Sequence, residues 1–273
     1  MSELDRGIAL ARTSAGRYDA EVDPGWFVLT GANGGYVAAL LVRAIEATVA
    51  EASDVPAQPK PLRSLSVQYL QPAAEGPAQV EVDITRVGRS LTFVDVRLRQ
   101  GGKLAAHGLA ALGSGRGAAG FQDGRPPEGT ALPDALPPPP PPPPGVPVPP
   151  IAHRLDYRPV AQKPLFSGAP AEFWCWLRLV DRPPVDAAML AVYADAMFPA
   201  LFFRSTIPVV VPTVDLTVHL RTPPRPGYDG WCLGHVRTSA VADGFAEEDC
   251  EIYDDAGMLL AQSRQLGLVV PLG

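Results

Sequence analysis

Alternating apolar and polar positions divide the first half of this chain into short runs. Side chains along a strand point to its two faces in turn, so such runs predict strands that bury one face. The runs are Leu62–Leu70, Ala78–Val87, Leu91–Gln100 and Lys103–Leu112. Gly101 and Gly102 separate the last two runs and indicate a tight hairpin. Together the runs predict an antiparallel sheet.

A segment of different pattern precedes these runs. Residues Tyr36 to Val49 are apolar on nearly all sides and rich in Ala and Leu, which predicts a buried helix. Asn33, Gly34 and Gly35 come directly before it, so Asn33 or a glycine is expected near its N-terminus. A helix followed by antiparallel strands is typical of an α+β unit whose sheet wraps around a central helix.

The second half repeats this order of elements. A helix is expected over Asp186–Ala196, and four strands and a turn follow it. These are Thr213–Leu220, Trp231–Ala240, Phe245–Tyr253, the turn Asp254–Gly257 and Met258–Val270. Residues also match: Ser64–Pro72 aligns with Asp215–Pro223, and Val96–Ala106 aligns with Cys250–Ala261 with one insertion. An ancestral unit of about a hundred residues has been doubled within one chain, and differences between the copies are where function can be sought.

A proline-rich segment, Phe121–Pro150, lies between the two repeats and holds eight consecutive prolines, Pro137–Pro144. Proline fixes φ and lacks an N–H, so this segment predicts a semi-rigid polyproline II connector. A docking peptide for a proline-binding domain is the alternative, and the position between the repeats favours a linker. The predicted organisation is residues 1–120 and 151–273 as two domains, joined by a linker at 121–150.

Composition excludes several classes of function. Across 273 residues the hydrophobic share is 47% and the net charge is −6, which disfavours nucleic acid as a partner. No apolar run reaches membrane-spanning length, and the N-terminus lacks a secretory pattern. Cys175, Cys232 and Cys250 are scattered, so neither disulfides nor a metal site is expected, and a cytoplasmic location is the simplest.

Three motifs in this order carry a resemblance to a known family. They are the helix entry Asn33–Tyr36, the run Ser66–Pro72 and the run Arg86–Phe93. The sequence resembles the hotdog fold, and two copies resemble the double-hotdog acyl-CoA thioesterases, the bacterial type II medium- and long-chain enzymes. The resemblance covers most of the chain outside the linker and the first twenty residues. It implies a tandem hotdog, acyl-CoA as substrate with no further cofactor, and either a monomer or a homodimer or larger homo-oligomer.

The same resemblance implies three catalytic residues in the second copy. Members of the family hydrolyse acyl-CoA with an Asp, a Thr or Ser and a Gln that together hold a water. Carried onto this chain, these are Asp215, Thr238 and Gln265, with Ser239 as the alternative hydroxyl. A carboxylate can take the proton of the water, while a hydroxyl and an amide can orient it. No Gly-x-Ser-x-Gly nucleophile motif is present.

Comparison of the repeats places one site in each chain. Asp215 aligns with Ser64, so the first copy lacks the carboxylate, and the first-copy position equivalent to Gln265 is about Ala110. The candidate substrate-binding residues are Gly34, Gly35 and Tyr36, because a helix N-terminus offers free N–H groups to a developing oxyanion. Alternatively, these glycines only allow close helix packing.

The sequence also permits other functions and other roles for several residues. The aromatic residues of Phe173–Trp176 could line an acyl tunnel or pack in the core. His219 and His235 could belong to a His–Asp pair of a hotdog hydratase or dehydratase. A non-catalytic acyl-CoA binding protein is the third possibility, against which only the Asp, Thr and Gln speak.

Overall fold

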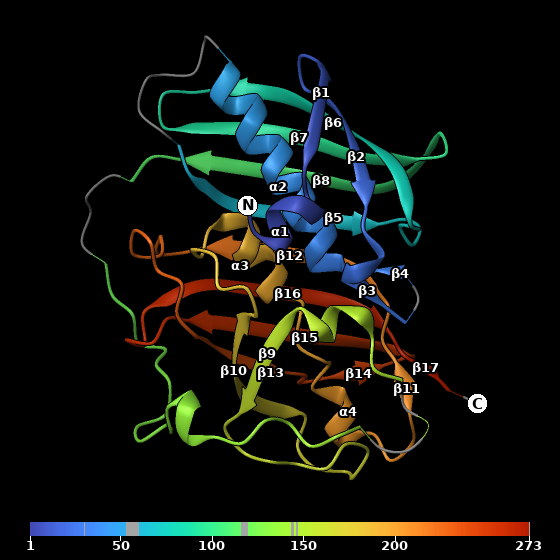
Figure 1. The fold of residues 1–273 in the computed structure, drawn as a ribbon, viewed down its shortest axis with the longest axis vertical. Helices are drawn as coiled ribbons and strands as arrows, with labels where there is room; N and C mark the ends of the chain where they lie inside the picture. The colour runs from blue at the N-terminus through green and yellow to red at the C-terminus, as the bar shows by residue number, and fades with distance from the viewer. Residues whose placement is uncertain (30, 53–59, 116–119, 143–144, 146, 273) are drawn as a thin grey trace.

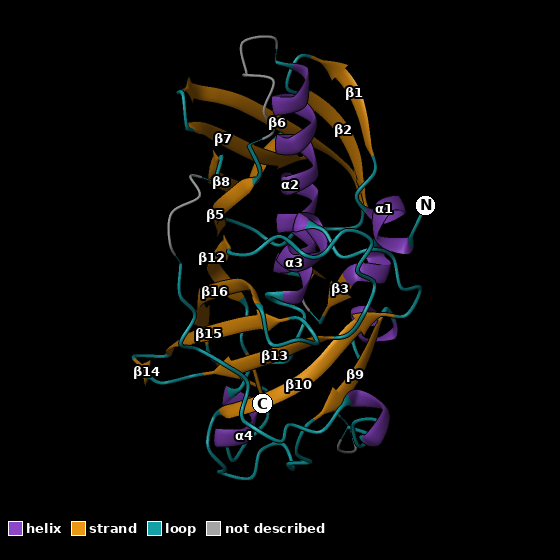
Figure 2. Ribbon diagram, turned by 90° about the vertical axis from the view of Figure 1, so that its left-hand side faces the viewer, coloured by secondary structure: helices purple, strands orange, loops and turns teal. Residues whose placement is uncertain are grey.

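One continuous antiparallel sheet forms the body of the protein in the computed structural model (Figure 1). The structure describes residues 1–29, 31–52, 60–115, 120–142, 145 and 147–272. Within these ranges the order along the sheet is β1-β2-β6-β7-β8-β5-β12-β16-β15-β13-β10-β9. The sheet curves around two helices, α2 and α3, which follow one another along the long axis (Figure 2). No helix in the described ranges has the length and apolarity needed to cross a membrane.

The first copy supplies one half of this sheet. Its helices are α1 (Glu3–Gly7) and α2 (Gly34–Glu51), and its sheet strands are β1 (Leu10–Ser14), β2 (Arg17–Val22), β5 (Leu62–Tyr69), β6 (Gly76–Val87), β7 (Leu91–Gln100) and β8 (Lys103–Gly113). The expected helix and four strands are therefore confirmed. Gly101 and Gly102 adopt φ of 56° and 77°, as the tight turn requires. The sequence analysis missed β1 and β2, which extend the sheet edge.

The second copy supplies the other half. Its elements are β9 (Leu155–Pro159), β10 (Glu172–Leu179), α3 (Ala187–Tyr193), α4 (Leu201–Arg204), β12 (Thr213–Leu220), β13 (Cys232–Arg237), β14 (Val241–Ala242), β15 (Phe245–Tyr253) and β16 (Leu259–Leu268). Short pairs complete the fold: β3 (Phe27–Val28) with β4 (Gly31–Ala32), and β11 (Val209–Val210) with β17 (Val270–Pro271). The helix α3 is shorter than the predicted helix over 186–196, because it ends at Tyr193.

The two copies meet at a local two-fold relation between β5 and β12. Thr217 lies opposite Ser66, and these two residues are equivalent in the aligned repeats. Their hydroxyls form a hydrogen bond of 2.9 Å. Positions on either side pair reciprocally, Asp215 with Gln68 and His219 with Ser64. The duplication read from the sequence thus corresponds to a symmetric pairing of the two central strands.

Close contact between α2 and α3 fixes the junction of the copies. Asn33 caps α2 by accepting a 3.0 Å hydrogen bond from the Tyr36 N–H. A β-carbon on Gly35 would lie 2.6 Å from the Ala191 carbonyl oxygen, so only glycine permits this approach. Gly35 thus packs against α3, whereas a β-carbon on Gly34 would lie 3.1 Å from the Tyr69 ring of β5. A role of these glycines in substrate binding stays a prediction. Most of α2 is buried, including Leu40, Leu41 and Ile45 at 0% exposure.

The proline-rich segment lies against the outer face of the second copy. Trp176 Nε1 donates to the Ala131 carbonyl at 2.9 Å, and Gln122 bonds both Leu259 N and Gly257 O, at 2.9 and 2.8 Å. Leu136 packs against the cluster of Trp176, Trp231, Leu233 and Tyr253. The segment therefore covers part of this face as well as connecting the copies. Of the proline run, residues 143 and 144 lie outside the described residues.

Candidate active site

The three residues expected to hold a water do not share one face of the sheet. Gln265 lies opposite Leu216, and both point to the helix side, where Leu216 is fully buried. Asp215 lies opposite Leu266 and Gln68, so its side chain points to the other face. The structure therefore does not bring Asp215 to Gln265, because successive residues of one strand point to opposite sides.

Thr238 and Gln265 do approach one another, through a carboxyl group that the sequence analysis missed. Glu248 on β15 lies opposite Gln265 on β16 and is only 7% exposed. Gln265 Nε2 donates to Glu248 Oε1 at 2.9 Å, and Thr238 Oγ1 lies 3.5 Å from Glu248 Oε2. The backbone N–H of Ala200 donates to the same Oε2 at 2.7 Å. Ser239, the alternative hydroxyl, offers only a backbone N–H bond to the outward-facing Glu247.

A second carboxyl group, Asp195, is half-buried and lies just beyond the end of α3. Its Oδ2 accepts hydrogen bonds of 2.9 Å from Asn33 Nδ2 and from the Gly35 N–H, which both belong to the first copy. The amide of Gln265 is a further hydrogen-bond partner of this carboxylate. Asp195 therefore stands where the N-terminus of α2, the end of α3 and strand β16 meet. It is a carboxylate in hydrogen-bonding contact with Gln265, the position expected for Asp215.

A hydroxyl completes the group. Thr213 Oγ1 donates to Gln265 Oε1 at 2.8 Å. The register of β12 against β16 shifts between Thr213 and Asp215, and this bulge turns Thr213 to the helix side. Gln265 thus contacts a hydroxyl on one side and two carboxyl groups on the other. We call Asp195, Thr213, Glu248 and Gln265 the polar cluster.

Both carboxyl groups of the polar cluster have pKa values that are raised toward pH 7. Burial raises the pKa of Asp195 to about 6, although the N–H of Gly35 and the amides of Gln265 and Asn33 favour its charged form. Burial also raises the pKa of Glu248 to about 8, against hydrogen bonds from Ala200 and Gln265, and the charge of Asp195 adds to that rise. Asp195 is thus mainly ionised and Glu248 mainly protonated at pH 7.

The three residues expected to bind substrate have different surroundings. The N–H of Gly35 and that of Gly34 both favour the charged form of Asp195, so the end of α2 binds a carboxylate of this chain. The N–H of Tyr36 is used by the Asn33 cap, and its hydroxyl donates to Gly7 O at 2.6 Å. The side chain of Tyr36 is fully buried and stacks on Trp26, so it is part of the core of the first copy.

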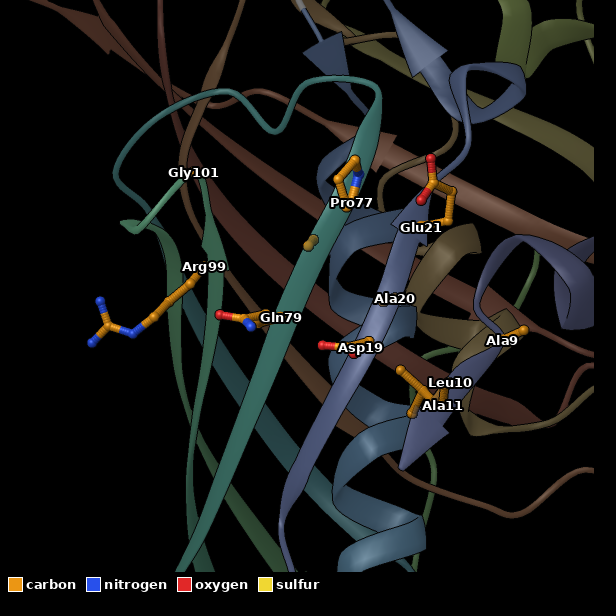
Figure 3. A pocket seen from close by; sticks show the side chains of 11 residues that line it. Ala9, Leu10, Ala11, Asp19, Ala20, Glu21, Pro77, Gln79, Arg99 and Gly101 are labelled. Carbon is orange, nitrogen blue, oxygen red and sulfur yellow. The ribbon is translucent and has the colours of Figure 1, made fainter. Parts of the chain in front are cut away.

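Two hollows in the described surface differ in chemistry. A small cavity beside the polar cluster is lined by Thr238, Glu248 and Gln265, together with the apolar residues Pro199, Leu201, Val211, Ala246 and Gly267. A larger open groove of about 690 Å³ lies on the first copy, where Asp19, Gln79 and Arg99 project from β2, β6 and β7 (Figure 3). The groove holds no buried carboxyl group and no residue of the polar cluster. The polar cluster, with the small cavity beside it, is therefore the candidate site.

The four histidines of the chain lie outside this site. His107 pairs with Asp95 at 2.7 Å and His235 with Glu172 at 2.7 Å, while His235 stacks on Trp174. His219 shares the outward face with Asp215, and His153 lies in a short 3₁₀ turn. The structure thus brings no histidine to Asp195. The aromatic run also divides: Phe173 stacks on Phe198 in the core, whereas Trp176 joins the outer cluster.

Weak signals for the missed residues exist in the sequence. Asp195 falls inside the predicted helix, but Pro199 four residues later indicates that this helix ends early. Glu247-Glu248-Asp249 interrupts an alternating strand, so one acidic side chain must point inward. Thr213 carries no sequence signal of its own, because a bulge cannot be read from alternation.

Comparison with known proteins identifies the family and the fold of this chain. The acyl-CoA thioesterase N-terminal domain model matches residues 22–113, and the C-terminal domain model of that family matches residues 133–269. An uncharacterized protein of Mycobacterium tuberculosis is 28% identical over 272 residues, covering 92% of this chain and 90% of that protein. A candidate thioesterase II from Thermobifida fusca shares 27% identity with a TM-score of 0.76, over 99% and 98% of the two chains. A hot dog fold protein of unknown function from Alicyclobacillus acidocaldarius matches over 100% of both chains, with a TM-score of 0.87 at 22% identity. The chain has the tandem hotdog fold and belongs to the acyl-CoA thioesterase family.

Proposed function

We propose that this protein hydrolyses acyl-CoA thioesters, with a water held by Asp195, Thr213 and Gln265. The observation that carries the proposal is the convergence of a half-buried carboxylate, an amide and a hydroxyl through the hydrogen bonds of Gln265. These are the three chemical types expected from the sequence. Asp195 and Thr213 take the places assigned there to Asp215 and Thr238.

In this mechanism Asp195 accepts a proton from the attacking water. A base is most effective when its pKa lies near the working pH, and burial brings the pKa of Asp195 to about 6. The Gly35 N–H and the Asn33 amide fix the carboxylate, so its orientation does not depend on solvent. Gln265 and Thr213 orient the water toward the thioester carbon. Positioning of this kind can lower a barrier by up to roughly 7–11 kcal/mol.

The N-terminus of α2 is the proposed source of positive potential for the developing oxyanion. The N–H groups of Gly34 and Gly35 are already directed at Asp195, so the helix end would act on the thioester oxygen through its partial positive charge rather than through a free N–H. Tyr36 contributes indirectly, because its N–H completes the cap that holds this helix end. When the tetrahedral intermediate collapses, the C–S bond breaks and CoA leaves as the thiol, taking the proton that Asp195 accepted from the water.

A substrate panel tests this function. The purified protein is incubated with acyl-CoAs from short to long chain, and free CoA thiol is measured over time. We expect thiol release with at least one chain length. Binding of acyl-CoA without thiol release would instead support the non-catalytic alternative, and hydration of an enoyl-CoA would support the hydratase alternative.

A further inference from the structure

Glu248 is a buried acid in the polar cluster to which the proposed reaction assigns no chemical step. It is 7% exposed, it has no cationic partner among its hydrogen bonds, and its neighbours on the same face of β15 are Ala246 and Cys250. A carboxyl group in such a place is costly unless every oxygen is hydrogen-bonded. Its oxygens meet this condition with donors from Gln265, Ala200 and Thr238.

The orientation of Gln265 depends on what surrounds its two ends. An amide has a nitrogen that only donates and an oxygen that only accepts, so its two orientations are not equivalent. The nitrogen of the Gln265 amide, Nε2, donates to Glu248 Oε1, and the oxygen of the same amide accepts from the Thr213 hydroxyl. If the amide turned over, its oxygen would face carboxyl groups and its nitrogen would face the threonine hydroxyl. When Glu248 is protonated, its proton can lie on Oε2 toward the Thr238 hydroxyl, which leaves Oε1 as an acceptor only. The carboxyl group therefore selects one orientation of the Gln265 amide.

We propose that Glu248 is a positioning residue that holds the Gln265 amide in the orientation needed to orient the attacking water. This inference rests on the proposed thioester hydrolysis. Glu248 touches neither the water nor the substrate in this role, and it acts through Gln265 alone. Thr238 partners Oε2 whether or not Glu248 is protonated, because a hydroxyl both donates and accepts.

The charge of Glu248 gives this role a pH signature. The titratable side chains that interact with it in the described structure are Asp195 and Cys250, and burial holds the pKa of the Cys250 thiol well above its usual value. Above pH about 8, Glu248 becomes a second negative charge beside Asp195 and opposes negative charge developing on the thioester. Activity should therefore rise through pH about 6, as Asp195 ionises, and fall through pH about 8.

The test compares the wild type with Glu248→Gln, and uses Glu247→Gln as the control. Glu247 is the adjacent acid on the outward face, where it accepts from Ser239 N and Ala240 N. In Glu248→Gln the Ala200 N–H holds the new amide oxygen in the place of Oε2, so the new NH₂ group faces Gln265 Nε2 and cannot accept from it. We expect Glu248→Gln to lower kcat by roughly 10-fold or more, with KM within about twofold, because small misplacements are costly in catalysis. The alkaline limb of its pH profile should disappear while the acid limb remains.

Several outcomes would overturn the inference. Unchanged kcat and an unchanged alkaline limb in Glu248→Gln would contradict the proposal that Glu248 positions the Gln265 amide. A loss of activity with the alkaline limb retained would show a structural effect only. If the variant does not fold, the wild-type profile decides, and a profile without an alkaline limb overturns the proposal. A wild type without thioesterase activity on any acyl-CoA refutes the proposed function instead, so the two failures are distinguishable.

Discussion

The two copies use the same framework for different purposes at equivalent positions. In the second copy Gln265 lies opposite Leu216 and Glu248; in the first copy Ala110 lies opposite Leu65 and Val94. Strands β5 and β12 each carry a bulge of one extra residue at the equivalent place, which makes Leu62 the counterpart of Thr213. Leu62, Val94 and Ala110 are all buried at 4% exposure or less. The same three positions thus carry apolar core residues in the first copy and polar cluster residues in the second.

The central helices differ for the same reason. Each begins after a capping residue, Asn33 in α2 and Asp186 in α3, whose side chain accepts a backbone hydrogen bond. Counted from these caps, Asp195 corresponds to Val42, which is buried in the middle of the 18-residue α2. Because α3 stops after 7 residues, the chain leaves the helix there. The early stop places Asp195 at the end of α2 and Ala200 at Glu248.

The largest expected effect is that of a substitution which distinguishes the role of Asp195 from that of Asp215. Asp195→Asn keeps the shape of the side chain but removes the proton acceptor, so kcat should fall by about 10²–10⁴-fold. Asp215→Asn changes a carboxylate on the opposite face of the sheet, and its activity should stay within about twofold of the wild type. Thiol release from acyl-CoA measures both, and circular dichroism checks the fold. An active Asp195→Asn beside an inactive Asp215→Asn would restore the assignment made from the sequence.

A second prediction converts the polar cluster into its first-copy equivalent. The variant Asp195→Val, Thr213→Leu, Glu248→Val, Gln265→Ala should lose nearly all activity. Its free energy of unfolding should be unchanged or higher by up to about 2 kcal/mol, because replacing a buried polar network as a whole is often neutral or stabilising. The matched control, Leu62→Thr with Ala110→Gln, introduces the hydroxyl and the amide without the carboxyl groups that accept from the amide nitrogen, and should destabilise by about 1–3 kcal/mol. Urea denaturation measures each change.

The same variant should change how stability depends on pH. Folding raises the pKa of Glu248 to about 8, from an ordinary value of 4.5. The stability linked to this group is therefore fully present below pH about 4.5 and is lost as the pH rises through about 8. The variant without Glu248 should lose less stability over that interval than the wild type does. An equal slope in both proteins would contradict the raised pKa.

Much of the scaffold could be predicted because its signal is periodic. The bounds of β7, β12 and β15 match the alternating runs, and the register confirms Ala110 as the counterpart of Gln265. The site was harder, because alternation assigns Asp215 and Leu216 to opposite faces without saying which chemistry belongs to the helix side. Asp195 depends on an early helix end, and Thr213 depends on a bulge. Both are decided by packing between elements far apart in the sequence.

The smallest expected effect concerns the outer faces of the two copies. In the second copy the segment around Gln122 covers the hairpin that carries Gly257 and Leu259, whereas the equivalent face of the first copy has the open groove of Figure 3. Gln122→Ala removes the hydrogen bonds of one side chain to this hairpin. The free energy of unfolding should fall by about 1 kcal/mol, since these bonds are partly exposed to water.

Activity should not change in Gln122→Ala, because Gln122 lies on the opposite side of the sheet from the polar cluster. Gln79→Ala in the open groove is the matched control, and its stability should stay within about 0.5 kcal/mol of the wild type. Thermal denaturation and thiol release measure both variants. A loss of activity in Gln122→Ala at unchanged stability would mean that the proline-rich segment acts on the site through the sheet. In that case the difference between the outer faces would belong to function, as the difference between the inner faces does.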